Sequence, residues 1–410
     1  MCTTYLAAVI IDKLAENGYN IHGLPRLIRL NPFARFKTRG NGAVHIKIST
    51  DNLKTTDLEK IEEIVLSNLE KLSVFSCENT NPGVIFYQGE IDNEWIEYSL
   101  KAIHSIITIS EAEEFANKKG AKFYKYDKGR GIIGSLAAIG TQLNDKTYEL
   151  LAYRIKENYG TKRQIVPESV HQMDKETYPD TFENIDGDYL AIEPHTGCPV
   201  LYGVRGESSQ ILEKAYKIIQ VKEPIERHQI FLTNQHTDMH LQKADKITDM
   251  EQYSSYIIQG KVKNYPRVIE GGHIFFTLQD HTGEIEAAAY EPTKDFRKIV
   301  KKLVPGDIVQ LYGGIGEQKT FNIEKFKLEK IAPEYKYENP ICECGKRMKS
   351  AGSNKGFKCP RCGNKLRDNQ KIKTQIPREI KEEFYESPIS ARRHLSKPLI
   401  RYRIQGGKLI

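Results

Sequence analysis

The sequence predicts a multidomain α+β protein made of successive folded units. Three observations support this prediction: helical and extended patterns alternate through residues 1–240, short strands of alternating polarity follow at 254–330, and four of the seven cysteines lie between Cys342 and Cys362. A chain of 410 residues with 39% hydrophobic and 28% charged residues has the composition of an ordinary globular protein. Its length is enough for about two to four domains.

Composition also predicts where the protein works. The longest apolar runs are far shorter than the roughly 18 residues that a membrane span needs, and the chain does not start with a basic signal region. Cysteines gathered in one short stretch indicate a metal site rather than a disulfide framework, and Cys2, Cys77 and Cys198 are predicted to be small buried residues. We therefore expect a cytoplasmic protein.

The first unit is expected to open with a helix. Apolar residues recur at helical spacing over residues 3–17, Thr3 or Thr4 can cap the helix, and Gly18 is placed to end it. An α/β unit rarely opens without the strand that leads into its first helix. We therefore expect a strand upstream of Met1, in which case Met1 is an internal methionine.

Strands and helices then alternate up to a first domain boundary after residue 118. Ser110 and Glu113 have the spacing of a capping box, at the start of a helix that should end near Gly120. The elements expected before this helix are strands at 25–30 and 43–49, a polar loop at 31–42, a helix at 57–69 and a strand at 84–87.

Residues 119–240 are predicted to form a ferredoxin-like α+β unit. The pattern of strand, helix, strands, helix and final strand is the order found in that fold. The expected elements are a strand ending near residue 126, a helix at 135–140, strands at 148–155 and 199–204, a helix at 208–219 and a strand at 229–232.

Residues 252–332 are predicted to form an OB-fold β-barrel, from three strands, a helix-compatible stretch at 293–303 and two more strands. Alternation puts Phe275 and Phe276 on opposite faces, so only one of them can lie inside the barrel. Such barrels stack single-stranded bases on exposed aromatic rings, although a purely structural barrel is the alternative. The candidate rings are Tyr265, Phe275, Phe276, Tyr290 and Tyr312.

Residues 338–368 are predicted to form a zinc ribbon. Cys342-x-Cys344 and Cys359-x-x-Cys362 are separated by fourteen residues, and four thiolates make a closed tetrahedral site for structural Zn²⁺. The short first pair predicts an irregular first knuckle. The surrounding cations favour a nucleic-acid contact, and they are Lys346, Arg347, Lys349, Lys358 and Arg361.

Positive charge is concentrated at the C-terminal end. Residues 336–410 contain 19 Lys+Arg and 7 Asp+Glu, a net +12, so the rest of the +7 chain carries about −5. A segregated basic region is typical of proteins that bind polyanions. We therefore expect residues 369–410 to form a basic tail that binds RNA through Arg392, Arg393 and Lys397. A basic tail that is merely solvated is the alternative.

Two glycine-containing loops could hold phosphate. Gly129-Arg-Gly-Ile-Ile-Gly134 precedes a helix and brings Lys128 and Arg130, but it could equally be a tight turn without a ligand. The loop at 36–42 is the stronger candidate because it combines two cations with two glycines. The candidate phosphate-binding residues of this loop are Lys37, Arg39, Gly40 and Asn41. Thr3, at a helix N-terminus, is a third place where phosphate charge would be stabilised, although simple capping is the commoner role.

Several motifs in one order resemble the archaeal TiaS family of isoleucine-tRNA 2-agmatinylcytidine synthetases, and the resemblance runs from end to end of the chain. The motifs are Met-Cys-Thr-Thr-Tyr5, Gly-Leu-Pro-Arg-Leu-Ile-Arg-Leu-Asn-Pro32, Lys-Thr-Arg-Gly-Asn-Gly42, Thr-Asn-Pro-Gly83, Arg-Gly-Ile-Ile-Gly-Ser-Leu-Ala-Ala-Ile-Gly140, Thr-Asn-Gln-His-Thr-Asp238 and Ala-Arg-Arg-His-Leu-Ser-Lys-Pro398.

The resemblance implies a fold and an activity. It implies a kinase-like catalytic domain at 1–118, followed by the ferredoxin-like domain, the OB-fold and the ribbon. The family uses ATP and agmatine to replace the 2-oxo group of the wobble cytidine in isoleucine tRNA with a CAU anticodon. It implies no membrane and no obligate protein partner. The alternative is a protein that binds tRNA or other RNA through its OB-fold and ribbon without catalysis.

The resemblance also implies site residues. The threonine matching Thr3 is phosphorylated during the ATP-consuming step, and Lys37 and Arg39 match a basic loop for the phosphates of ATP. His195 and Asp238 are expected near the agmatine and the target base, although a buried structural His195 is the alternative. The family has an acidic Asp-Asp-Thr-Asp-Ser motif for Mg²⁺ just before the segment that opens this chain. That motif is absent here, so we expect activity to be impaired.

Overall fold

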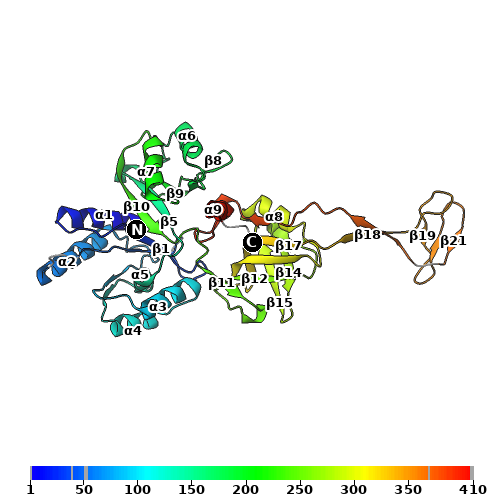
Figure 1. Cartoon of the computed structure of the whole chain (residues 1–410), viewed down its shortest axis with the longest axis horizontal. Helices are drawn as coiled ribbons and strands as arrows, with labels where there is room; N and C mark the ends of the chain where they lie inside the picture. The colour runs from blue at the N-terminus through cyan, green and yellow to red at the C-terminus, as the bar shows by residue number, and fades with distance from the viewer. Residues whose placement is uncertain (1, 38–39, 50–53, 368–369, 407–410) are drawn as a thin grey trace.

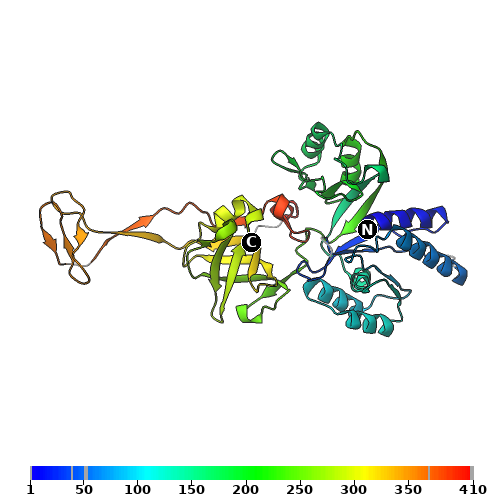
Figure 2. The same ribbon diagram turned by 180° about the vertical axis from the view of Figure 1, so that it is seen from behind.

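The computed structural model describes residues 2–37, 40–49, 54–367 and 370–406. Figure 1 shows an elongated molecule with the two N-terminal units at one end, the barrel in the middle and the ribbon at the tip of a long arm. The view from behind in Figure 2 shows the same three bodies in a row. In the part of the chain that the structure describes, no helix is both long and apolar enough to cross a membrane.

The first unit contains most of the elements expected from its sequence. The capping box before α4 is formed by Thr108 and Glu111 rather than by Ser110 and Glu113, and helix α3 was not foreseen. The elements are α1 (Thr3–Glu16), β1 (Arg26–Arg29), β2 (Gly42–His45), α2 (Thr55–Leu72), β3 (Gly83–Phe86), α3 (Asn93–His104), α4 (Ile109–Lys118), β4 (Lys122–Lys125) and α5 (Gly131–Gly140).

Strand β4 and helix α5 pack with the first unit, although the sequence pattern predicts them in the second. β4 pairs antiparallel with β3. α5 buries Ile132 and Leu136 in the same core as Trp95 of α3. The backbones of Gly83 and Gly131 approach so closely that a Cβ on Gly83 would lie 2.2 Å from the Ile132 nitrogen. A pairing partner far back along the chain therefore decides where this segment belongs.

The second unit is ferredoxin-like, as predicted, but its first strand is β5 and its first helix is the unforeseen α6. Its sheet has the order β10-β5-β9-β6. The elements are β5 (Thr147–Arg154), α6 (Pro167–Thr177), β6 (Thr181–Phe182), β7 (Ile185–Asp186), β8 (Tyr189–Leu190), β9 (Val200–Gly206), α7 (Ser209–Ile218) and β10 (Ile225–Thr233).

The two N-terminal units share one six-stranded sheet, in the order β2-β1-β10-β5-β9-β6. β1 pairs in parallel with β10, the last strand of the second unit. Helix α1 covers one face of this sheet, where Leu27, Leu151 and Phe231 are buried. Helices α6 and α7 cover the other face of the second unit's strands.

The third unit is a closed OB barrel. β12 pairs with both β14 and β16, and β15 pairs in parallel with β17, which closes the sheet. Phe276 lies in the barrel core, whereas Phe275 is on the outer face under Tyr290. The strands are β11 (Leu241–Ala244), β12 (Ser255–Val262), β13 (Arg267–Val268), β14 (Ile274–Gln279), β15 (Glu284–Ala289), β16 (Ile308–Ile315) and β17 (Phe321–Lys330), with helix α8 (Asp295–Val300).

A two-stranded arm connects the barrel to the ribbon. Its strands are β18 (Glu334–Glu338) and β22 (Ile372–Ile376), and the ribbon between them contains β19 (Lys349–Ser350), β20 (Phe357–Lys358) and β21 (Lys365–Leu366). After the arm the chain returns to the barrel as β23 (Phe384–Glu386), which pairs with β17, and ends in α9 (Leu399–Ile404). Short 3₁₀ helices lie at 156–158, 247–249, 270–272, 291–293 and 389–391.

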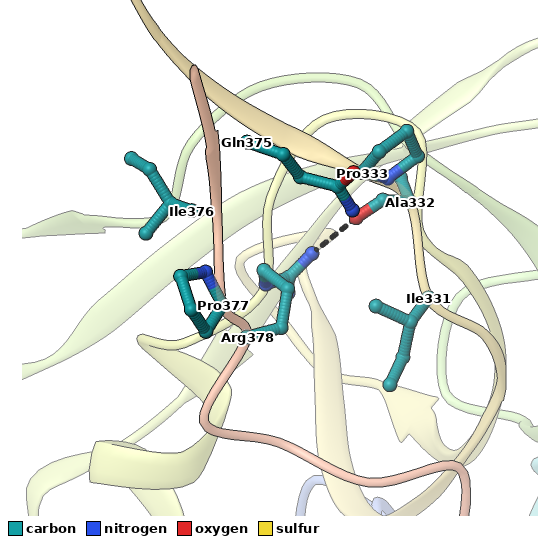
Figure 3. Close-up of a pocket in the computed structure, with 7 residues that line it drawn as sticks. All are labelled: Ile331, Ala332, Pro333, Gln375, Ile376, Pro377 and Arg378. Atoms are coloured by element: carbon teal, nitrogen blue, oxygen red, sulfur yellow. Dashed lines mark hydrogen bonds between the residues drawn. The ribbon is translucent and has the colours of Figure 1, made fainter.

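The base of the arm is clamped by Arg378. Its guanidinium makes two hydrogen bonds to the buried carboxylate of Asp307, at 3.0 and 2.8 Å, and also donates to the carbonyl oxygens of Ala332 and Lys302. Figure 3 shows Arg378 lining a pocket of about 410 Å³ where the two arm strands leave the barrel. Arg378 therefore links the two chain segments at the base of the arm to Asp307 and to Lys302, which follows helix α8.

Replacing Arg378 by Ala should destabilise the barrel by about 3 kcal/mol, because it leaves the Asp307 carboxylate buried without its counter-charge. Thermal unfolding and chymotrypsin cleavage at the arm base measure the effect, because neither this substitution nor the control removes a site for chymotrypsin. Lys371→Ala, at an exposed position just before β22, is the control and should leave both unchanged. An unchanged unfolding midpoint in Arg378→Ala would show that the clamp carries no stability.

Candidate functional site

The N-terminus of helix α1 is open to an anion. Cys2 occupies the N-cap position, but its side chain caps no amide, and no acidic residue lies in the first turn. Thr3 is exposed, whereas Thr4 is buried with its hydroxyl 3.3 Å from the Cys2 sulfur. Because the first amides of a helix have no partner within it and carry partial positive charge, this end favours negative charge.

Charged side chains lie on the same face of the sheet as α1. Arg29 is two residues from the buried Leu27, and Glu149 is two residues from the buried Leu151, so alternation along β1 and β5 places both on that face. Glu149 lies 3.2 Å from the Arg205 guanidinium and 3.6 Å from that of Arg29. We call these three residues, together with His394, the Arg29 cluster.

The Arg29 cluster is a neighbour of the helix N-terminus and is electropositive. Two guanidinium groups share one carboxylate, and Arg29 interacts electrostatically with Cys2 at the start of α1. Burial lowers the pKa of Arg29, but a guanidinium stays charged at neutral pH. Its buried Nε has no hydrogen-bond partner among the residues described. This arrangement can accept phosphate oxygens.

His394 reaches the cluster from the C-terminal segment. Burial, together with the charges of Arg29 and Arg205, holds the pKa of His394 well below its ordinary value. The imidazole is therefore neutral at neutral pH, so it can accept or donate a hydrogen bond without adding charge.

The predicted phosphate loop at 36–42 is held against the same cluster. Arg29 donates to the Gly40 carbonyl at 3.1 Å, and the Asn41 side chain donates to the Asn31 carbonyl at 2.8 Å. A Cβ on Gly40 would lie 2.3 Å from a nitrogen of the Arg29 guanidinium, so a side chain at this position would displace the end of the Arg29 side chain. Burial, and then the charge of Arg393, lower the pKa of Lys37. Arg39 lies outside the described residues.

The second predicted loop is a packed turn whose amides are largely occupied. The Gly131 amide donates to Asn81, and the Ile132 amide donates to Gly129, which leaves little backbone for a phosphate. Lys128 is exposed. The Arg130 side chain instead stacks on the ring of Phe36, with its guanidinium carbon 4.3 Å from the ring centroid. The structure thus brings the two loops together through side chains.

His195 lies on the second unit, in a loop near the start of α1. It stacks on Tyr189, whose hydroxyl is 2.9 Å from its Nε2 atom, and it is exposed rather than buried. The same loop wraps around Arg163, which donates to the carbonyls of Pro194, Thr196, Cys198 and Val200. Cys198 packs in the same apolar cluster as Cys2, so His195 lies beside the candidate site rather than within the Arg29 cluster.

The structure pairs Asp238, which is predicted to lie near agmatine, with groups inside the protein. Its carboxylate accepts from the Lys325 ammonium, the Tyr402 hydroxyl and the Lys397 amide. Burial alone would raise the pKa of Asp238, but the charges of Lys325 and His240 and the hydrogen bonds to the carboxylate together lower it. These oxygens already have their partners, so Asp238 joins the barrel to the C-terminal segment.

The C-terminal cations are also paired within the protein. Arg392 binds Glu183 and Glu386 with its side chain 6% exposed, and Lys397 binds Asp145. Arg393 contacts Glu324 but remains 34% exposed. The three cations predicted to bind RNA therefore lie in an internal strap, because acidic side chains of the second unit and the barrel pair with them.

Sequence reasoning missed Arg29, Glu149, Arg205 and His394. The only available signal was a charged residue at an inward position of an apolar strand, as in Tyr148-Glu149-Leu150. Alternation marks such a residue as buried, and a buried charge needs a partner or a function. It does not say which distant strand supplies that partner.

The four ribbon cysteines form a site that fits Zn²⁺. Their Sγ atoms all lie within 4.8 Å of one another, and two pairs are 3.5 Å apart. Tetrahedral Zn–S bonds of about 2.3 Å require S–S separations of about 3.8 Å. Gly345 and Gly363 take positive φ angles just after each knuckle, which glycine allows without strain. The predicted cations Lys346, Arg347, Lys349, Lys358 and Arg361 are all exposed around this site.

Family comparisons match each unit in turn. Residues 1–128 match the TiaS TCKD domain and residues 129–240 the TiaS FLD domain. Residues 256–336 match an OB-fold nucleic acid binding domain, and residues 339–380 match the TiaS C-terminal zinc ribbon domain. The four matches follow the order of the units in the structure.

Curated relatives match the chain over almost its whole length. The isoleucine-tRNA 2-agmatinylcytidine synthetase TiaS of Archaeoglobus fulgidus is 42% identical over 99% of this chain and 95% of its own. That of Methanocaldococcus jannaschii is 44% identical over 97% of this chain and 95% of its own.

Solved structures agree in fold. A complex of TiaS with its isoleucine tRNA and ATP superposes with a TM-score of 0.90 at 41% identity, covering 100% of this chain and 96% of that one. A complex of TiaS with the same tRNA, AMPCPP and agmatine gives a TM-score of 0.88 at 39% identity, with the same coverage. With its units, their order and its cysteine cluster all matched, the chain belongs to the TiaS family of isoleucine-tRNA 2-agmatinylcytidine synthetases.

Proposed function

We propose that this chain is an ATP-dependent ligase that joins agmatine to the 2-position of the wobble cytidine of the isoleucine tRNA with a CAU anticodon. The observation that carries the proposal is the match of the whole chain to relatives of that activity, at 41–44% identity for several of them. The open N-terminus of α1 beside the Arg29 cluster supports it, since the reaction must stabilise transferred phosphate.

The chemistry requires activation of a poor leaving group. Transfer of a phosphoryl group from ATP to the 2-oxygen of cytidine turns that oxygen into a leaving group. The primary amine of agmatine then attacks C2, a C–N bond forms, the C–O bond breaks, and phosphate leaves with the oxygen. The amine loses a proton in this step, so the site needs an acceptor near the nucleophile.

We assign roles to this chain's residues from their positions. Thr3, exposed at the open helix end, is the hydroxyl that takes and passes phosphate. Arg29 and Arg205 stabilise the negative charge that accumulates there, and Lys37 adds positive charge from the loop between β1 and β2. We propose that the exposed His195 contacts the base or agmatine beside this site.

Mg²⁺ is proposed only as the ion that accompanies ATP. Among the residues described, the sole cluster suited to a metal is that of the four cysteines, and the carboxylate nearest the site, Glu149, already binds Arg29, Arg205 and Gln235. No step above depends on this ion.

We propose that the barrel and the ribbon bind the tRNA. The exposed cations around the cysteines suit phosphate contacts. Among the candidate rings of the barrel, Tyr265 is exposed and suits an unpaired base, whereas Phe275, Phe276 and Tyr312 are buried. Cysteine thiols stay reduced, and so able to bind Zn²⁺, in a reducing compartment, which supports a cytoplasmic location.

The test is incorporation of labelled agmatine into a transcript of the isoleucine tRNA with ATP present. A chain extended through the upstream in-frame codons is assayed in parallel, because the family's acidic motif lies on that side. We expect incorporation that depends on both ATP and the CAU anticodon. If neither chain incorporates agmatine while both bind tRNA, the ligase assignment fails and the protein is an RNA-binding protein without catalysis.

Thr3→Ala should lower agmatine incorporation by about 100-fold or more while leaving tRNA affinity unchanged, because the variant lacks the hydroxyl that passes phosphate. Thr55→Ala is the matched control, since Thr55 is also an exposed first residue of a helix but lies on α2. Equal incorporation by Thr3→Ala and the control would refute this role.

Cys359→Ser should abolish stoichiometric zinc, measured by elemental analysis, because a tetrahedral site with three thiolates binds the ion less tightly. We expect tRNA affinity to fall by about tenfold or more, with the barrel still folded by circular dichroism. Cys77→Ser is the control, because Cys77 lies outside the ribbon and is exposed, contrary to the prediction that it is buried. Retained zinc in Cys359→Ser would contradict the assignment of these ligands.

A further inference from the structure

Phe36 is the most exposed large hydrophobic residue in the described part of the chain. Its side chain is 67% exposed, on the loop between β1 and β2. The Arg130 guanidinium carbon lies 4.3 Å from its ring centroid, and that of Arg35 lies 5.6 Å away. An aromatic ring held open to solvent and flanked by two guanidinium groups contributes little to a core.

The loop that carries Phe36 is anchored on both sides of the ring. On one side Asn31 donates to the Tyr253 carbonyl of the barrel at 2.7 Å, and Phe33 is buried with its ring against Gly314 of β16. On the other side Gly40 accepts the hydrogen bond from Arg29. The Phe36 ring is therefore exposed to solvent on an anchored loop at the junction between the catalytic half and the barrel.

Positive charge surrounds the ring at this junction. Arg130 has no ion-pair partner among the residues described, and Arg35 pairs only with the exposed Glu317 of the β16–β17 hairpin, at 3.2 Å. Lys37 follows Phe36 directly, and Arg393 stacks on Phe33 at 4.2 Å. A flat exposed ring with cations beside it is the arrangement with which proteins bind an unpaired base and its phosphates.

We propose that Phe36 and Arg130 form a stacking platform for an unpaired base of the bound tRNA. This proposal rests on tRNA being the substrate, as proposed above. The platform faces the nucleic-acid-binding barrel, through Arg35 and Glu317, and so favours a base of the tRNA over the adenine of ATP. A base stacked on Phe36 would hold the RNA across the junction, next to the loop that approaches the Arg29 cluster.

The substitution Phe36→Trp places a fluorescent indole on the platform, so that tRNA binding at this position can be followed directly. The chain has a single tryptophan, Trp95, which is fully buried, so the new indole is the only exposed one. Addition of the isoleucine tRNA should quench this indole and protect it from acrylamide, whereas saturating ATP alone should do neither. An indole equally accessible to acrylamide with and without bound tRNA overturns the proposal, and protection by ATP alone assigns the platform to the nucleotide instead.

Two further substitutions of Phe36 distinguish base stacking from a general apolar contact with the RNA. Phe36→Leu should weaken tRNA binding by about 5- to 100-fold and raise KM for tRNA, with KM for ATP and the unfolding midpoint unchanged. Phe36→Tyr should bind like the original chain because the ring is retained. Equal affinity of the Leu and Tyr variants overturns the proposal.

The fluorescence titration of Phe36→Trp with tRNA measures binding and does not depend on agmatine transfer. Failure of the ligase assay alone therefore leaves this result standing, whereas an original chain that binds no tRNA overturns both proposals.

Discussion

The parallel pairing of β1 with β10 is the constraint on which the catalytic half depends. It joins two units into one sheet through the pairs Arg26–Leu232 and Leu27–Thr233. Asn234 extends the pairing, since its side chain accepts from the Arg29 amide at 2.7 Å and donates to the Arg29 carbonyl at 2.9 Å. This pairing brings Arg29 to the face where Glu149 and Arg205 lie, beside the start of α1.

The second organising feature is the C-terminal strap. Arg392 reaches Glu183 of the second unit, and Arg401 pairs with Asp145 and Glu207 while fully buried. Buried ion pairs add little net stability because their charges lose solvation, but leaving one partner unpaired is costly. The strap therefore specifies one placement of the barrel on the catalytic half, and it also delivers His394 to the Arg29 cluster.

The candidate catalytic site and the ribbon, which is the candidate RNA-binding surface, lie far apart in the molecule. The loop of Phe36 lies where the catalytic half meets the barrel and is held against the Arg29 cluster. The ribbon strands β19 and β21, which flank the cysteine cluster, lie at the tip of the arm (Figure 1). The clamp of Arg378 on Asp307 fixes where the arm leaves the barrel. A long, folded RNA is a ligand that could contact both places at once.

Sequence by itself determined the features that local patterns encode. Spacing predicted helix α1, the strands of the barrel, the opposite faces of Phe275 and Phe276, and the four cysteine ligands; ordered motifs predicted the family. Only the tertiary structure decided that Phe276 is the ring inside the barrel, that β4 pairs with β3, that β1 joins β10, and that Arg392 meets Glu183, 209 residues away. Periodicity and spacing report how a residue relates to its near neighbours along the chain. The partner of a strand edge or a buried charge is fixed by packing between distant segments, so only the structure shows that Arg392 and Lys397 of the predicted basic tail pair inside the protein.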